Sequence, residues 1–220
     1  WVPMPDRLRR PRSDAGMTLV EMLVSMLVFS VAVTLVYGAV IFTMRTMNES
    51  QQSSDAVTEA RLALATIDRQ VRSGNVLYSP ENEPTLYSGC TADPGTNSGT
   101  CMRIFTQSNG DQKCVQWQVL DDGSGNGTAD LRVRSWETTY PAGDATDWSV
   151  AARGLVLGTD QPFTLLGADS PYDERLLRVQ IDVRDERTDG TSSIVSSLAG
   201  RNTSYGYDTG RCEPVPDDIP

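Results

Sequence analysis

The residues Gly16-Met17-Thr18-Leu19-Val20-Glu21-Met22-Leu23 open an apolar segment that continues to Met44. The segment 17–44 has 28 residues, and Glu21 is its only charged residue. Because about 20 apolar residues suffice for a helix to cross a bilayer, the segment predicts a membrane-spanning helix. An isolated charge at mid-bilayer costs roughly 2.5–3.5 kcal/mol, so a plain anchor gains nothing from Glu21. We therefore expect the carboxylate to have a function and a partner.

Two other interpretations of the segment are weaker. A secretory signal peptide has an apolar core of about 7–15 residues and a small-residue cleavage site, and 17–44 is too long for that. A single-pass anchor with a stray glutamate fits the length but gives no reason for the carboxylate. The preceding residues have a net charge of +2, from Arg7, Arg9, Arg10, Arg12, Asp6 and Asp14. Because basic flanks stay in the cytoplasm, this charge predicts a cytoplasmic amino terminus and an external carboxyl-terminal domain.

The segment resembles the amino-terminal signature of the type IV pilin superfamily, which includes minor pilins and type II secretion pseudopilins. The resemblance rests on Gly16, the position of Glu21, the Leu-Val-Glu-Met-Leu context and the basic leader. It implies that a prepilin peptidase cuts after Gly16 and that Met17 becomes the N-methylated terminus. Met17 stands where the family more often has Phe, which leaves the cleavage prediction intact. The resemblance also implies that Glu21 neutralises the terminal amine of a neighbouring subunit.

Four regions are expected along the chain: a cleaved leader at 1–16, a transmembrane and filament-core helix at 17–44, an amphipathic continuation at 45–75, and an extracytoplasmic β-rich domain at 76–220. In the continuation, apolar residues recur at spacings of three and four, which is typical of one helix face packed on a core. These residues are Val57, Ala60, Leu64, Ile67 and Val71. Ser73-Gly74-Asn75 is expected to end the helix.

The remainder of the chain alternates between turn signals and short β-type runs. Asn109-Gly110 between 102–106 and 114–120 predicts a hairpin. Further strands are expected at 131–136, 155–157, 163–166, 176–184 and 192–199, whereas 78–100 has the composition of a loop. The predicted fold class is α+β: a long amino-terminal membrane-spanning helix packed on an antiparallel β-sheet, as pilin-like proteins have.

The four cysteines lie in the part expected outside the cytoplasm, where an even number predicts two disulfides. They are Cys90, Cys101, Cys114 and Cys212. A turn at Asn109-Gly110 places Cys114 opposite Phe105 and four rungs from Cys101, about 13 Å at about 3.3 Å per residue. This exceeds the Cα separation of about 7 Å that a disulfide allows. Two pairings then stay open: Cys90–Cys101 with Cys114–Cys212, which we favour, and Cys90–Cys114 with Cys101–Cys212, which is the alternative.

The loop 122–130 partly follows the EF-hand calcium pattern. Oxygen donors fall at places 1, 3, 5 and 9, and Gly127 falls at place 6, where the sharp turn needs glycine. The donors are Asp122, Ser124, Asn126 and Asp130. Place 12, which should be a bidentate Glu, is Val133. The sequence thus allows a weak calcium site, and a flexible Gly/Asn loop without metal explains the same residues. No other cofactor is expected.

Composition excludes several classes of function. The chain has no histidine, which removes Ser-His-Asp, Cys-His and His-zinc chemistry, and no carboxylate pair or nucleophile motif points to an enzyme. The formal net charge is −10, so bulk capture of nucleic acid, which needs cations, is not expected. Loop aromatics suggest a binding surface as a separate hypothesis; they are Trp148, Tyr205 and Tyr207.

The resemblance implies a structural role. The expected function is that of a minor pilin, a low-copy subunit of a type IV pilus assembled after cleavage by prepilin peptidase. The alternatives are a pseudopilin of a type II secretion or DNA-uptake machine and a membrane-anchored surface adhesin. The expected partners are the prepilin peptidase, other pilin or pseudopilin subunits, the membrane and, indirectly, the assembly platform and its ATPase. The chain is expected first in the inner membrane and then in a surface pilus or pseudopilus.

Overall fold

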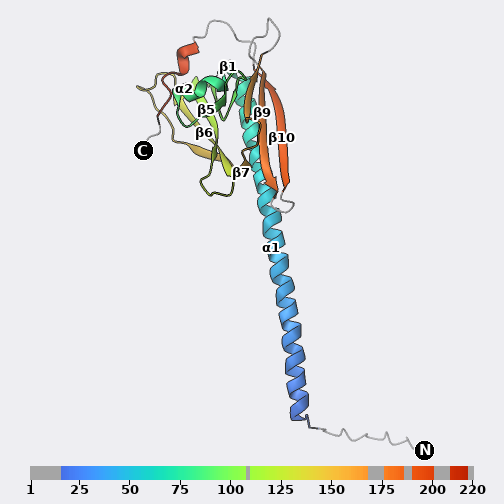
Figure 1. The fold of residues 1–220 in the computed structure, drawn as a ribbon. Coiled ribbons are helices and arrows are strands. Elements are labelled where there is room, and N and C mark those ends of the chain that lie inside the picture. Colours follow the sequence, from blue (N-terminus) through green and yellow to red (C-terminus); the bar gives the residue numbers. More distant parts are fainter. Residues whose placement is uncertain (1–15, 108–109, 168–175, 186–189, 201–208, 218–220) are drawn as a thin grey trace, which may run out of the picture. The chain divides into compact units, whose positions relative to one another are not determined.

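A computed structural model describes residues 16–107, 110–167, 176–185, 190–200 and 209–217 (Figure 1). The helices are α1 Leu19–Arg72 and α2 Glu83–Leu86, and the 3-10 helices are η1 Pro80–Asn82 and η2 Thr209–Cys212. The strands are β1 Gly74–Leu77, β2 Ala92–Asp93, β3 Ser98–Gly99, β4 Cys101–Thr106, β5 Lys113–Asp121, β6 Thr128–Glu137, β7 Ser149–Val156, β8 Phe163–Leu166, β9 Leu176–Asp185 and β10 Gly190–Ala199. The chain divides after Met47 into two compact units. The predicted α+β class is confirmed: a long apolar amino-terminal helix precedes an antiparallel sheet domain.

All strands of the second unit pair antiparallel in one sheet of order β1-β4-β5-β6-β7-β9-β8-β3-β2, with β10 added on β9. The predicted first hairpin has the expected register, because Cys114 of β5 lies opposite Phe105 of β4. Gly110 has a φ of +88°, which glycine adopts without steric cost. Ser108 and Asn109 of the predicted turn lie outside the described residues.

One face of this sheet packs on the carboxyl-terminal part of α1. Four of that helix's residues are buried in the main core: Ala60, Ala63, Ile67 and Val71. Val57 and Leu64, also on the predicted stripe, are partly buried against the same core. Two hydrogen bonds add to this packing, because Trp117 Nε1 donates to Gln70 Oε1 at 2.7 Å and Thr106 Oγ1 donates to the Gln70 carbonyl at 3.0 Å. The helix ends at Arg72, one residue before the predicted stop.

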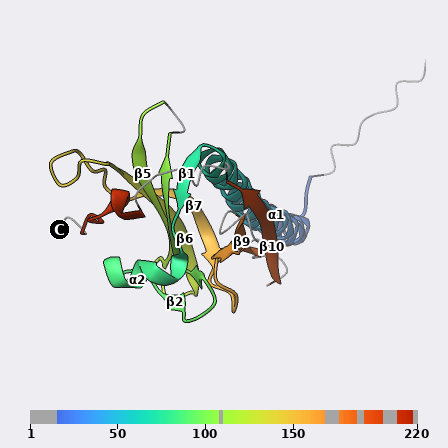
Figure 2. The same cartoon turned by 90° about the horizontal axis from the view of Figure 1, so that it is seen from above.

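The opposite face of β4, β5 and β6 is covered as well. Figure 2 shows α2 and the segment near the carboxyl terminus on the other side of β5 and β6 from α1. A second apolar cluster forms there; its buried members are Tyr87, Cys90, Cys101, Phe105, Cys114, Trp136, Cys212 and Val215. Every residue of β4 is therefore buried, whichever face it points to.

Several elements differ from expectation. The segment expected to be a loop at 78–100 contains η1, α2, β2 and β3, and β1 was not predicted. The strand expected at 155–157 begins earlier, at Ser149, and ends at Val156. These elements are short or interrupted by Gly and Pro, so their strand pairing depends on contacts with distant segments, which local propensity does not encode.

The structure pairs the cysteines as Cys90–Cys101 and Cys114–Cys212, with Cα separations of 5.5 and 5.6 Å. This is the favoured of the two pairings that the hairpin register left open. The first disulfide joins the 78–100 segment to β4, and the second joins the carboxyl-terminal segment to β5. Both therefore fasten the cover of the second sheet face to the sheet itself.

Candidate functional site

The helix α1 begins with an N-cap that the sequence analysis missed. Thr18 precedes the first helical residue, and its Oγ1 accepts a hydrogen bond from the Glu21 backbone N–H at 3.3 Å. The Thr18 carbonyl accepts the first intrahelical bond, from Met22 N at 3.2 Å. Thr-x-x-Glu is the sequence pattern of a capping box, which was the available signal. Glu21 thus lies in the first turn, where a negative charge favours the helix dipole.

The two residues at the predicted cleavage site are exposed. Gly16 precedes the helix, and a Cβ built on it meets no atom within 4 Å. Its backbone is not in the left-handed region that favours glycine, because no positive φ is found there. The described part of the chain therefore gives no steric reason for glycine at this position. A requirement for Gly16 would have to come from another molecule that reads this segment.

The apolar part of α1 is uncovered within this chain. Residues Leu19–Asn48 are long and apolar enough to cross a membrane, and none of their most apolar window is buried. Leu19 is 78% exposed and Phe42 is 73% exposed. A contiguous apolar surface of this kind marks contact with lipid or protein.

The serine and threonine hydroxyls within this segment bond to the helix itself. Ser25 Oγ donates to the Glu21 carbonyl at 2.7 Å, and Thr34 Oγ1 donates to the Ser30 carbonyl at 2.8 Å. Ser30, Thr43 and Thr46 make equivalent bonds to carbonyls three or four residues earlier. Since these serine and threonine hydroxyls need no outside partner, the residues fit a helix surrounded by lipid or by other helices.

Glu21 is the only charged residue of 17–44, and its side chain is exposed. The ion pairs found in the described part of the chain involve Asp68, Glu83 and Glu213, and Glu21 is in none of them. A carboxylate on an apolar helix surface needs a counter-charge once the surface is covered. The predicted processing and assembly residues, Gly16, Met17 and Glu21, therefore lie together at the exposed start of α1, open to other molecules.

A buried polar network, not foreseen from the sequence, lies on the second sheet face. The Glu83 carboxylate from α2 accepts from Arg103 Nε at 3.0 Å and from Gln116 Nε2 at 2.8 Å. Glu83 is 0% exposed and Arg103 is 2% exposed. Arg103 also donates through Nη1 to the Cys212 carbonyl at 2.8 Å. The network thus joins three segments that are distant in sequence.

The burial of Glu83 has an electrostatic cost. Desolvation raises the pKa of the Glu83 carboxyl above its ordinary value, against the opposing effects of Arg103 and of the hydrogen bond from Gln116. Burial therefore outweighs the attraction of the guanidinium. The contacts of this pair join α2, β4, β5 and the segment around Cys212 to one another.

The neighbouring arginines hold the predicted loop aromatic Trp148. The Arg134 guanidinium lies 4.5 Å from the Tyr87 ring centre and 4.4 Å from that of Trp148. Arg132 belongs to β6, and its guanidinium lies 5.0 Å from the Trp148 ring centre. Trp148 is therefore part of a cation–π stack instead of standing free for a ligand. Tyr205 and Tyr207, the other two predicted aromatics, lie outside the described residues.

The predicted calcium loop is held by its own hydrogen bonds. The Asp122 carboxylate accepts from the Thr128 hydroxyl and from the Ser124 backbone N–H, and these bonds lower the pKa of Asp122. Asp130 lies in β6, where desolvation raises its pKa. Among the residues described, no group of three or more His, Cys, Asp or Glu side chains is placed to hold a metal. Calcium binding at Asp122, Ser124, Asn126 and Asp130 stays a prediction without support from this geometry.

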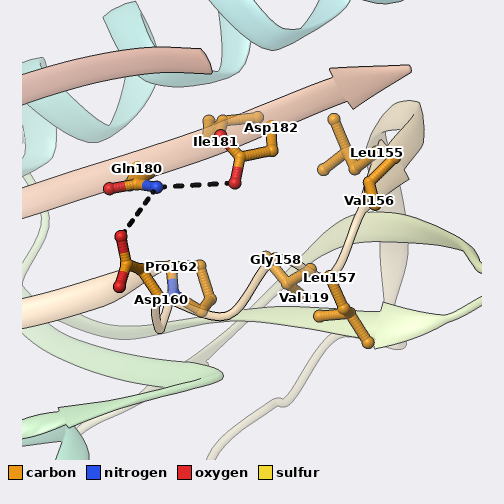
Figure 3. Close-up of a pocket in the computed structure, with 10 residues that line it drawn as sticks. All are labelled: Val119, Leu155, Val156, Leu157, Gly158, Asp160, Pro162, Gln180, Ile181 and Asp182. Carbon is orange, nitrogen blue, oxygen red and sulfur yellow. Dashed lines mark hydrogen bonds between the residues drawn. The ribbon is translucent and has the colours of Figure 1, made fainter. Parts of the chain in front are cut away.

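A small cavity lies between the end of β7 and β9 (Figure 3). Gln180 Nε2 donates to Asp160 Oδ2 and to Asp182 Oδ2, both at 3.4 Å. The cavity has a volume of ≈ 10 Å³, whereas pockets for small organic ligands measure about 300–1,000 Å³. It is therefore not a substrate site.

Residues 11–37 match the family model described as "Prokaryotic N-terminal methylation motif". This motif is the type IV pilin and prepilin signature, so the resemblance drawn from the sequence is confirmed for this segment. The motif implies processing by a prepilin peptidase and assembly with other pilin-type subunits, which is the role of a structural subunit and not of an enzyme. Together with the apolar helix it indicates anchoring in a membrane. No curated protein and no solved structure gives a significant match to the chain.

Proposed function

We propose that this chain is a minor pilin, a low-copy structural subunit of a type IV pilus. The observation that carries the proposal is the methylation motif at 11–37, which continues directly into an apolar helix with an exposed surface. The acidic external domain and its long loops favour a low-copy subunit over the main one. A pseudopilin of a secretion or DNA-uptake machine would carry the same motif, and the adhesin alternative loses support because Trp148 is held in a stack with Arg132 and Arg134.

In this proposal the peptidase cuts between Gly16 and Met17 on the cytoplasmic side. The helix then leaves the bilayer and packs among the helices of like subunits. There the Glu21 carboxylate pairs with the Met17 amine of a neighbour. An unpaired charge in an apolar bundle is costly, so this pair favours insertion in one register. The apolar surface of 19–48 is covered first by lipid and then by protein.

Mass spectrometry of sheared surface filaments and of membranes tests the proposal. We expect a mature chain that starts at Met17 in the filaments, at a few per cent of the main pilin. A mature chain found only in membranes would contradict the minor pilin and indicate a pseudopilin or an assembly primer. An uncut chain that persists in the membrane would instead support a surface-anchored binding protein.

Glu21→Ala is expected to block incorporation into filaments while cleavage continues. The variant leaves the Met17 amine of a neighbour without a counter-charge, at a cost of at least about 2.5 kcal/mol in an apolar environment. Since 1.4 kcal/mol corresponds to a factor of ten, incorporation should fall more than about tenfold. Immunoblots of filaments and membranes measure both quantities. Asp55→Ala, which removes an exposed carboxylate from the same helix, is the control. Wild-type levels of the Glu21 variant in filaments would exclude this mechanism.

Gly16→Leu is expected to leave the uncut precursor, which keeps residues 1–16. The structure has room for a side chain at Gly16, so a failure of cleavage would reflect the peptidase and not misfolding. The amino-terminal sequence of the chain isolated from membranes gives the result. Gly38→Ala is the matched control, since a Cβ at that helical glycine also meets no atom within 4 Å. Normal trimming of the Gly16 variant would refute the assigned site.

A further inference from the structure

The strand β10 forms an edge of the sheet. It pairs with β9 over ten consecutive positions, from Gly190 opposite Asp185 to Ala199 opposite Leu176, without a bulge. β7 and β8 pair with other parts of β9, so they share the second side of that strand. Within the described ranges β10 pairs with no strand besides β9. Its outer row of backbone N–H and C=O groups has no strand partner among the described residues and so offers pairing positions to another strand. Figure 1 shows β9 and β10 side by side at this border.

The side chains of β10 include none of the charged or proline residues that usually prevent such pairing. Edge strands are usually protected by lysines, prolines, bulges or shortness. β10 has the sequence GTSSIVSSLA, with no charged residue and no proline. Its ten residues exceed the usual strand length of about 5–6. By contrast, the strands at the two ends of the sheet order, β1 and β2, have only four and two residues.

The strand is anchored on one face and open on the other. Leu198 is buried in the main core and Ile194 packs partly against it. Val195, which points to the other face, is 51% exposed. Its outward neighbours are small and uncharged; they are Thr191, Ser193, Ser197 and Ala199. β10 is thus held in extended form by the core while its edge and outer face are accessible, which is the geometry that strand addition requires.

We propose that β10 accepts an extended strand from the β-domain of a neighbouring subunit of different sequence. This inference rests on the proposed function, which supplies the neighbour. Only an extended polypeptide matches a row of alternating backbone donors and acceptors. The uncharged outer row accepts small or β-branched cross-strand partners. The added strand continues the sheet from one subunit into the next and fixes the orientation of the two domains.

A second copy of this chain fits less well. Symmetric pairing of β10 with β10 needs a two-fold axis between the copies, whereas subunits in a filament are related head to tail. Head-to-tail pairing of identical chains would join β10 to β1 or β2, which are too short to match it. The chain without 1–16 has a formal net charge of −12, because those residues contribute +2 to the total of −10. Two such copies repel each other.

Site-specific cross-linking in the native organism tests the inference. A photo-crosslinking amino acid is placed at position 195 of the full chain, or at position 150 as the control. Val150 of β7 is also an exposed strand valine, at 40%. We expect irradiation to join position 195, but not 150, to a different pilin-type protein, identified by mass spectrometry. An adduct of two copies of this chain, or no protein adduct at 195, would overturn the proposal.

A second measurement uses charge on the edge. Val195→Lys should lower the recovery of the neighbouring subunit with this chain several-fold, because the ammonium opposes strand pairing. Val150→Lys should have no effect. If the wild-type chain is absent from filaments but still cross-links at 195 in the membrane, the minor-pilin function fails and the docking edge stands. If the wild-type chain is in filaments and position 195 gives no adduct, the docking edge alone fails.

Discussion

Removing the Glu83 carboxylate is expected to lower the free energy of unfolding by about 3–5 kcal/mol, the usual effect of breaking a buried ion pair. Glu83→Ala leaves the Arg103 guanidinium 2% exposed and without this partner. It also removes the acceptor of Gln116 Nε2. Urea unfolding of the full chain in detergent, followed by tryptophan fluorescence, measures the change.

Two further variants show whether burial causes the effect. Asp68→Ala breaks the Arg72–Asp68 pair, in which the arginine side chain is 72% exposed, and should cost less than about 1 kcal/mol. The double variant Glu83→Leu/Arg103→Met replaces the buried pair with apolar groups and should recover much of the lost stability. A loss at Glu83 no larger than that at Asp68 would show that the buried pair is not a stabilising contact.

The pH dependence has a definite sign. Because burial raises the pKa of Glu83, the folded chain holds this proton more tightly than the unfolded chain does. The resulting contribution to stability is fully present below the ordinary value of about 4.3 and is lost as the pH rises through the folded-state pKa. In Glu83→Ala this part of the pH dependence should disappear, which the same unfolding experiment detects when repeated across the acid range.

Loss of the Cys114–Cys212 disulfide is the second large effect that we expect. The bond joins residues 98 apart in sequence, and closing a loop of about 100 residues is worth about 4.7 kcal/mol in the chain-entropy estimate. Cys114→Ala/Cys212→Ala should therefore lower the free energy of unfolding by about 4–5 kcal/mol.

The other disulfide provides the comparison. Cys90 and Cys101 are 11 residues apart, so Cys90→Ala/Cys101→Ala should cost less than about 3 kcal/mol. Denaturant unfolding of both double variants under oxidising conditions gives the two values. Equal losses would show that the entropy of the unfolded chain does not set the contribution of these bonds.

The sequence was informative where a local pattern coincides with a physical requirement. The 3-4 spacing from Val57 to Val71 predicted the helix face that packs on the sheet, and three of its five residues are fully buried: Ala60, Ile67 and Val71. Asn109-Gly110 predicted the register that sets Phe105 opposite Cys114. That register in turn excluded the Cys101–Cys114 disulfide, which the structure does not form. Each prediction depended on contacts between neighbours in the chain or across one turn.

The buried polar network escaped prediction for the opposite reason. Arg103 and Gln116 alternate with apolar residues along their strands, which is typical of a sheet with one face in water. Their burial depends on α2 and on the segment around Cys212, which reach this face from distant parts of the sequence. Period-two alternation shows which residues share a face and does not show whether a second layer covers it.

The order of the four cysteines has a consequence for biogenesis. In the orientation that the proposed function requires, the β-domain enters an oxidising compartment behind the membrane helix and exposes its thiols one after another, from 90 to 212. The first two to emerge, Cys90 and Cys101, form a pair in the structure, and the next two, Cys114 and Cys212, form the other. Oxidation in order of emergence gives the native connectivity directly. Under the proposed function, maturation of this domain therefore requires an oxidant for its thiols but no exchange of one disulfide for another.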